Sequence, residues 1–67
     1  MRIMSNKNYR VRRFSTGIAK RRFPDCDYGS IPGSEVRPIL RGCKYDPEFD
    51  MWFSKGSLIG YSVEAID

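Results

Sequence analysis

The clearest pattern in the chain is an alternation of apolar and polar residues close to its last residue. Every second residue between 59 and 65 is apolar, namely Ile59, Tyr61, Val63 and Ala65. The residues between them are small or polar, namely Gly60, Ser62 and Glu64. Successive side chains of a β-strand point to opposite faces, so this period of two predicts a strand with one buried face.

A second alternating segment spans residues 8–15. One face of the predicted strand is mostly apolar, with Tyr9, Val11 and Arg13. The opposite face is mostly basic, with Arg10, Arg12 and Phe14. We therefore predict a strand that packs one side against a core and presents arginines on the other side.

Turn-forming residues separate this strand from the rest of the chain. Residues 15–17, Ser-Thr-Gly, predict a turn or a helix cap. A short helical turn follows and ends before Pro24, because proline disfavours helical geometry in the residue that precedes it. Residues 24–34 hold two prolines, two glycines, two aspartates and two serines, which predicts a loop. Residues 1–8 show no period, and we expect them to fray.

Residues 35–45, with the sequence EVRPILRGCKY, have the composition of a strand. Pro38 lacks the backbone N–H that a central strand donates, so this strand is expected at a sheet edge or beginning after Pro38. Gly42 indicates a bulge or a bend.

Residues 46–55 have two interpretations. In the first, Asp46 caps a helix that begins at Pro47. In the second, the same two residues begin the turn of a hairpin, and Asp50 adopts a left-handed conformation. The flanking strands of that hairpin are KY and MWF. We favour the hairpin, because its aromatic residues, including Trp52 and Phe53, are strand formers.

These elements predict a single small domain over residues 1–67, of the α+β or mostly β class. The expected architecture is a small twisted antiparallel sheet, or an SH3-like partly open barrel, with at most one or two short helices. The stretch PGSEVRPILRG, residues 32–42, resembles the turn–strand–glycine order of small SH3-like barrels. The resemblance covers eleven residues and includes no specific signature.

Charge is distributed unevenly along this pattern. Residues 1–23 hold eight Lys and Arg and no Asp or Glu, which gives a formal charge of +8. Residues 24–67 hold four basic and eight acidic residues, which gives −4. A basic segment of this density is expected to meet an opposite charge on nucleic acid, on another protein, or on the second half of this chain.

The basic segment is the candidate binding site, and it consists of Tyr9, Arg10, Arg12, Arg13, Lys20, Arg21 and Arg22. Arginine forks bind phosphate oxygens at two points, and interleaved aromatic rings stack on unpaired bases. We therefore expect a small non-enzymatic module that binds nucleic acid, either DNA or RNA. The alternative is a small regulator or inhibitor, of the size that viruses and mobile elements encode, that docks its basic surface on an acidic surface of a larger protein. A third interpretation leaves the basic face in solvent, with Phe14 and Phe23 in the core.

Trp52 and Phe53 are adjacent, so in a strand they point to opposite faces of the sheet. An exposed aromatic ring near a basic surface suits either base stacking or a protein contact. We name Trp52 as the candidate exposed aromatic contact. The alternative places one of the two rings in the core and the other beneath the N-terminal segment.

The residue types that usually carry catalysis and metal binding are scarce. The chain has no His, so it lacks the usual general base near neutral pH. Asp46 begins a sequence that imitates a calcium loop, but the glycine and glutamate required at its sixth and twelfth positions are Met51 and Ser57. We expect no enzyme activity, no cofactor and no metal.

The two cysteines, Cys26 and Cys43, do not form a CxxC pair, and we expect both to be reduced and buried. The chain contains no apolar run near the roughly 18 residues that a membrane span needs. We therefore expect no membrane association and a cytoplasmic location.

Overall fold

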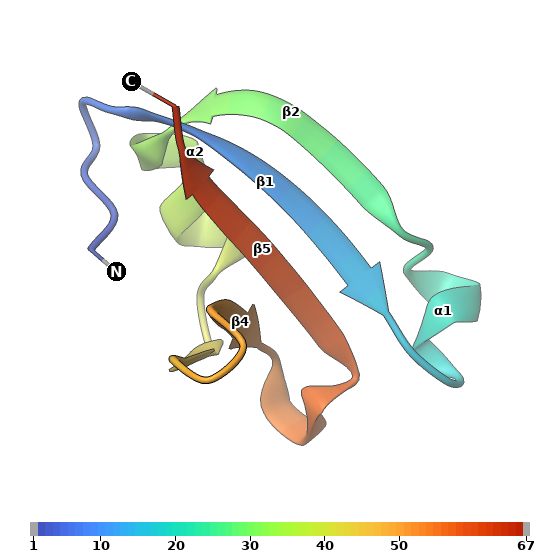
Figure 1. The fold of residues 1–67 in the computed structure, drawn as a ribbon. Helices are drawn as coiled ribbons and strands as arrows, with labels where there is room; N and C mark the ends of the chain where they lie inside the picture. The colour runs from blue at the N-terminus through green and yellow to red at the C-terminus, as the bar shows by residue number, and fades with distance from the viewer. Residues whose placement is uncertain (1, 67) are drawn as a thin grey trace.

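The computed structural model describes residues 2–66 and contains a five-stranded antiparallel sheet with the strand order β2-β1-β5-β4-β3 (Figure 1). The elements, in chain order, are β1 (Asn8–Ser15), α1 (Ala19–Arg22), β2 (Cys26–Pro32), α2 (Gly33–Ile39), β3 (Lys44–Asp46), β4 (Met51–Phe53), the 3-10 turn η1 (Lys55–Ser57) and β5 (Ile59–Ala65). This confirms the predicted small α+β fold with an antiparallel sheet. Strands β2 and β3 are the two edges, so the sheet is open.

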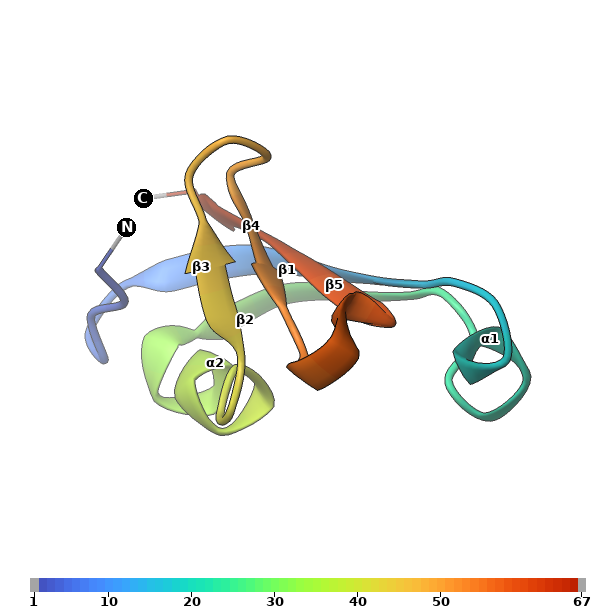
Figure 2. The ribbon, with the colours of Figure 1, turned by 90° about the horizontal axis from the view of Figure 1, so that it is seen from below.

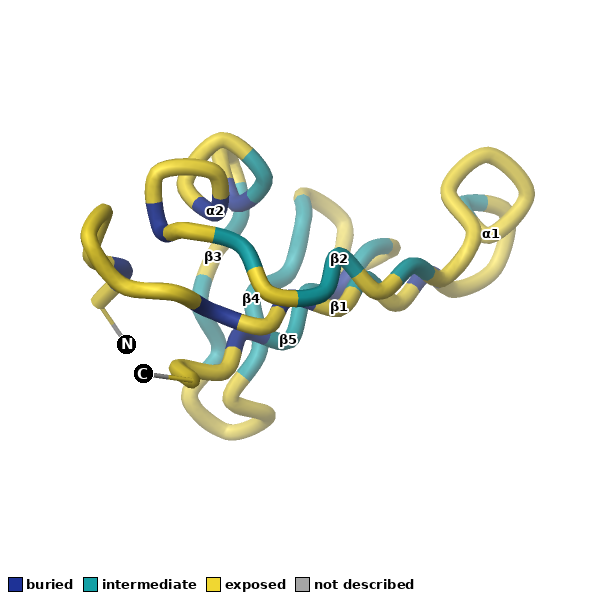
Figure 3. The backbone as a smooth tube through the Cα atoms, turned by 90° about the horizontal axis from the view of Figure 1, so that it is seen from above, coloured by how far each residue is buried: buried dark blue, intermediate teal, exposed yellow. Residues whose placement is uncertain are grey.

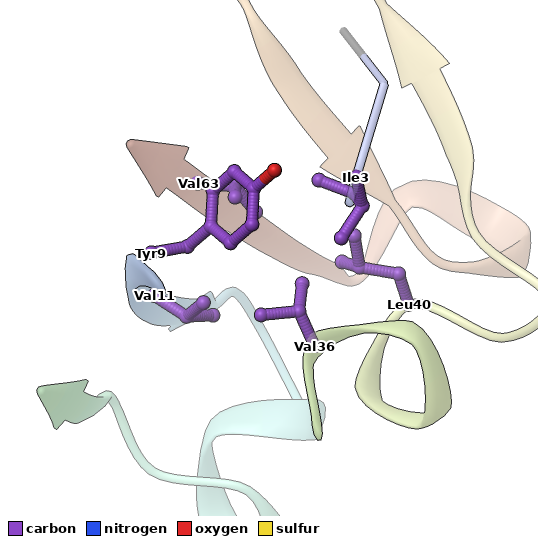
Figure 4. Packing of buried hydrophobic residues seen from close by; sticks show 6 residues of the cluster. All are labelled: Ile3, Tyr9, Val11, Val36, Leu40 and Val63. Carbon is purple, nitrogen blue, oxygen red and sulfur yellow. The ribbon is translucent and has the colours of Figure 1, made fainter. Parts of the chain in front are cut away.

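Helix α2 covers one face of the sheet, and the core lies between them. Val11 of β1 and Val36 of α2 are both 0% exposed. Tyr9, Val63, Leu40 and Ile3 complete the buried cluster, as Figure 4 shows. The sheet is strongly twisted, and β3 and β4 cross steeply relative to β1 and β2 (Figure 2). None of the helices within residues 2–66 has the length and apolar composition needed to span a membrane.

Strands β1 and β5 confirm the two alternating patterns. They pair antiparallel, with Val11 opposite Val63 and Tyr9 opposite Ala65. Directly opposite residues project to the same face, so the apolar positions of both strands meet beneath α2. Arg10 and Arg12 project to the other face and are exposed, as predicted.

The hairpin interpretation of residues 44–53 is also confirmed. Strands β3 and β4 pair with Tyr45 opposite Trp52. Asp50 has φ 53°, the left-handed conformation expected of it. Asp46 stabilises the turn, because its Oδ1 accepts a hydrogen bond of 2.9 Å from the backbone N–H of Glu48.

The prediction of a loop over residues 24–34 is wrong, because Cys26–Pro32 forms the edge strand β2. Its hydrogen-bonding partner is β1, and the register shifts between Val11 and Arg12, which makes a bulge. Gly29 has φ 72°, a conformation that glycine adopts without strain, and it stands opposite Val11. An edge strand bonds on one side only, so it tolerates the glycine and proline that suggested a loop.

The prediction of a strand over residues 35–45 is wrong for residues 35–43, because Gly33–Ile39 forms helix α2 and a turn follows it. Only Lys44 and Tyr45 of the predicted strand lie in β3. Val36 and Leu40 are four residues apart, a helical spacing, and both face the core. Pro38 lies near the end of this short helix, so it removes only one intrahelical hydrogen bond. The following N–H of Leu40 still donates to Val36 O at 3.0 Å. Burial against the sheet outweighs the weak helix propensity of this segment.

The prediction that residues 1–8 fray is wrong for the described part of that segment. Ile3 is only 9% exposed and belongs to the core. Its carbonyl accepts a hydrogen bond of 2.9 Å from Arg37 Nη2. The carbonyl of Lys7 accepts a second bond of 2.8 Å from Gly33 N. The N-terminal segment is therefore tied to the start of α2 by contacts that its own sequence does not indicate. Residue 1 lies outside the described residues.

The close approach of the N-terminal segment to α2 leads to a test of the fold. A Cβ atom at Gly33 would collide with the backbone carbonyl oxygen of Met4. We expect Gly33→Ala to lower the free energy of unfolding by about 1–3 kcal/mol, although alanine is the better helix former. Urea unfolding, monitored by circular dichroism, measures this change in the free energy of unfolding. Ser34→Ala, at an exposed neighbouring position, is expected to change stability by no more than about 0.5 kcal/mol. A Gly33→Ala protein as stable as the wild type would contradict this packing.

Candidate nucleic-acid interface

The candidate site is built on the hairpin of β1, α1 and β2, residues 8–32, here called the basic hairpin. It holds six basic and two acidic residues, for a formal charge of +4. Its far end, with α1, projects beyond the rest of the sheet (Figures 1 and 3). No residue of α1 is buried, and Ile18 and Phe23 at its two ends are 79% and 44% exposed.

Local hydrogen bonds hold the projecting end in place. Gly17, with φ 57°, makes the turn after β1, and its carbonyl accepts from Lys20 N. At the base of the projection, Ser15 N donates to Asp25 Oδ1 at 2.9 Å. Thr16 N donates to the carbonyl of Leu58 at 2.9 Å, which ties the hairpin to the start of β5. The predicted short helix before Pro24 is confirmed, and these contacts position it.

Along β1, Arg10, Arg12 and Phe14 form a row on the face of the sheet opposite α2, here called the open face. All three are exposed. The interpretation that puts Phe14 and Phe23 in the core is wrong, because these side chains are 42% and 44% exposed.

Asp27 of β2 is shared by two of these arginines. Arg10 Nη2 lies 2.9 Å from Asp27 Oδ2, and Arg12 Nε lies 3.7 Å from the same oxygen. The hydrogen bond from Arg10, and then that from Gly29 N, hold the pKa of Asp27 below its usual value. The same bond to Asp27 raises the pKa of Arg10. One carboxylate therefore partly compensates two cations, and all three groups are accessible to solvent.

The positive charges of the three basic residues of α1 are less compensated by carboxylates than those of Arg10 and Arg12. Lys20 Nζ lies 3.9 Å from Asp25 Oδ2. Within residues 2–66, neither Arg21 nor Arg22 has a carboxylate within ion-pair distance. All three side chains are exposed.

Two of the predicted binding residues are structural instead. Tyr9 is 2% exposed, and its hydroxyl oxygen accepts a hydrogen bond of 2.8 Å from Met4 N. The guanidinium of Arg13 donates to the carbonyl of Pro24 at 2.8 and 3.2 Å and to the Tyr28 hydroxyl at 3.3 Å. Tyr9 and Arg13 are neighbours of the candidate binding residues in the sequence. The alternation of side chains along β1 nevertheless points them to the opposite face, toward α2.

Trp52, which was predicted to be an exposed aromatic contact, is not exposed in the structure. This side chain is half-buried against the core, and its ring contacts that of Tyr45 with centroids 5.3 Å apart. Its neighbour Phe53 projects to the open face, where it makes an edge contact with the exposed ring of Phe49. The prediction that the two neighbours point to opposite faces holds, but the ring on the open face is Phe53.

The sequence analysis missed an apolar depression on the open face. It has a volume of about 370 Å³ and is lined chiefly by Phe14, Met51, Phe53, Leu58 and Gly60. Strand β5 lies between β1 and β4, so Gly60 has Phe14 on one side and Phe53 on the other. The alternation of Phe14 with Arg10 and Arg12 was a signal of its exposure. Nothing in the sequence indicates that Phe53 lies near Phe14, on the second strand from β1 in the sheet.

Acidic residues gather away from the basic end. The turn between β3 and β4 carries Asp46, Glu48 and Asp50, and it lies on the opposite side of the molecule from α1 (Figure 2). Within residues 2–66, every ion pair of the basic hairpin uses Asp25 or Asp27. The acidic turn between β3 and β4 therefore does not neutralise the basic hairpin.

The remaining candidate chemistry is limited. Cys26 and Cys43 are half-buried free thiols, and burial raises the pKa of Cys43. Among the described residues, no three side chains of the types that bind metals gather into a site. Comparison with protein-family models, with curated proteins and with solved structures found no match for this chain.

Proposed function

We propose that the protein is a non-enzymatic nucleic-acid-binding module that contacts phosphates through Arg10, Arg12, Lys20, Arg21 and Arg22. One observation carries the proposal: these exposed cations run along β1 onto the projecting α1, and within residues 2–66 only Asp25 and Asp27 form ion pairs with them. The proposal includes a cytoplasmic location, where nucleic acid is at hand and free thiols stay reduced.

The pairing of Arg10 and Arg12 with Asp27 supports this role. Both guanidinium groups are held on the open face, so they are oriented before a ligand arrives. An exposed ion pair is weak, and a phosphate group can replace Asp27 as the acceptor. Glu64 of β5 stands opposite Arg10 of β1. The positive charge of Arg12 is therefore less compensated by nearby carboxylates than that of Arg10.

A second candidate function rests on the apolar ends of α1. Ile18 and Phe23 are exposed beside Lys20, Arg21 and Arg22, a combination that suits docking into an acidic groove of a larger protein. Capture of a partner from lysate that survives nuclease treatment, and that is lost in Ile18→Ser, favours this function. Loss of all capture after nuclease treatment favours nucleic acid.

The phosphate contacts are tested by charge reversal at the tip. We expect Arg21→Glu/Arg22→Glu to weaken the binding of labelled DNA or RNA and to flatten the slope of log K against log salt by about 0.7–0.9 per lost contact. Fluorescence anisotropy at several salt concentrations measures both effects. Arg2→Glu/Arg41→Glu makes the same change in net charge at exposed residues outside the basic hairpin. Absence of binding by the wild type at low salt, or equal losses in both double variants, would overturn the proposal.

Removal of the Asp27 charge is expected to strengthen nucleic-acid binding, whereas the charge reversals above weaken it. The pKa of Asp27 is lowered, so its carboxylate stays charged at neutral pH and competes with phosphate for Arg10 and Arg12. We expect Asp27→Asn to tighten nucleic-acid binding about two- to fivefold, since exposed ion pairs of this kind are weak. The amide oxygen of asparagine can still accept the bond from Gly29 N. Glu48→Gln, at the acidic turn, makes the same charge change and is expected to have a smaller effect. Equal gains in the two variants would point to net charge alone.

A further inference from the structure

The apolar depression on the open face has no part in the phosphate contacts described above. Phe14 and Leu58 are 42% and 43% exposed, and Met51 and Phe53 are half-buried. Helix α2 lies against the opposite face of the sheet (Figure 2). Exposed apolar surface of this kind, bordered by polar residues, marks an interaction site.

Gly60 forms the floor of the depression. Phe14 on β1 and Phe53 on β4 stand opposite Gly60 from its two sides. A Cβ atom at Gly60 would lie 2.9 Å from Met51 Cε and 3.0 Å from Phe53 Cε1, so the two side chains lean over this position. Met51 and Phe53 therefore fill the space above Gly60, and the hollow lies between these two side chains, Leu58 and the ring of Phe14.

Positive charge borders the hollow on its β1 side. Arg12 precedes Phe14 by two residues on the same face of β1, and Arg10 precedes Arg12 by two more. The β3 side carries both signs of charge, because Lys44 stands opposite Phe53 and Asp46 stands opposite Met51. A ligand with an aromatic group next to anionic groups on the β1 side matches this order of side chains.

The exposed ring of Phe14 favours unpaired bases, because stacking needs access to the flat face of a base. A duplex hides these faces inside its own stack. Only an unstacked strand can place a base on Phe14 and phosphates on the arginines before it.

We infer that the ligand of the open face is single-stranded nucleic acid, with an unpaired base stacked on Phe14 at the hollow and adjacent phosphates on Arg10 and Arg12. This rests on the proposed nucleic-acid-binding function and adds its substrate class. Phe49 is exposed on the same side of β4, but Glu48 and Asp50 flank it and repel phosphates. The strand therefore runs from the hollow along β1, away from the acidic turn.

The test compares a labelled thymidine oligonucleotide of about 12 nucleotides, within the usual site sizes for a single strand, with a DNA duplex of the same length. We expect the wild type to bind the single strand more tightly. Phe14→Leu keeps an apolar side chain at an exposed site and is expected to weaken single-strand binding about fivefold or more, with the salt slope unchanged because no charge is lost. Phe14→Tyr retains a stacking ring and is expected to bind as the wild type does. Phe49→Leu removes a ring that is more exposed than Phe14 but lies at the acidic turn, and it is expected to have no effect.

The possible results distinguish a failure of the single-strand inference from a failure of the proposed nucleic-acid-binding function. Equal or tighter binding of duplex, with no effect of Phe14→Leu, would overturn the single-strand assignment and leave the phosphate contacts of the hairpin standing. Absence of binding to either probe would overturn both. A salt slope that falls in Phe14→Leu as much as in Arg12→Glu would also count against stacking. Thermal unfolding of each variant verifies that the affinities refer to folded protein.

Discussion

The packing of Val36 and Leu40 of α2 on Val11 and Val63 of the sheet is the contact on which the rest of the structure depends. A chain of 67 residues has little apolar surface to bury, and here the buried cluster lies on one face of one sheet. Helix α2 is too short to be stable alone. The sheet holds the helix, and the helix supplies the cover that the sheet needs.

A core on one side leaves the other side of the sheet for function. Strand alternation turns Tyr9 and Val11 toward α2, and the same alternation turns Arg10, Arg12 and Phe14 toward solvent. The candidate interface is thus the reverse side of the core, and the strand that anchors the fold also presents the proposed binding residues. Under the proposed function, substitutions on one face of β1 act on stability and substitutions on the other face act on binding.

The order of the strands explains why the acidic turn does not neutralise the basic hairpin. Strand β5 separates the β1–β2 pair from the β3–β4 pair, so the acidic turn between β3 and β4 lies away from the arginines. The two aspartates that do pair with the hairpin also accept backbone hydrogen bonds, Asp25 from Ser15 and Asp27 from Gly29. They shape the hairpin while leaving it with a net positive charge.

What the amino-acid sequence determined by itself was local. The period of two in β1 and β5 and the turn chemistry around Asp50 predicted two strands and one turn correctly, because neighbouring residues carry those signals. Only the tertiary structure decided that Val36 and Leu40 pack on the sheet from a helical segment and that the glycine- and proline-containing β2 is a strand. It also decided that Arg13 is held by hydrogen bonds while Arg21 has no ion-pair partner within residues 2–66. Each of these outcomes depends on a partner from a distant segment: the sheet face for α2, the edge of β1 for β2, and the carbonyl of Pro24 for Arg13.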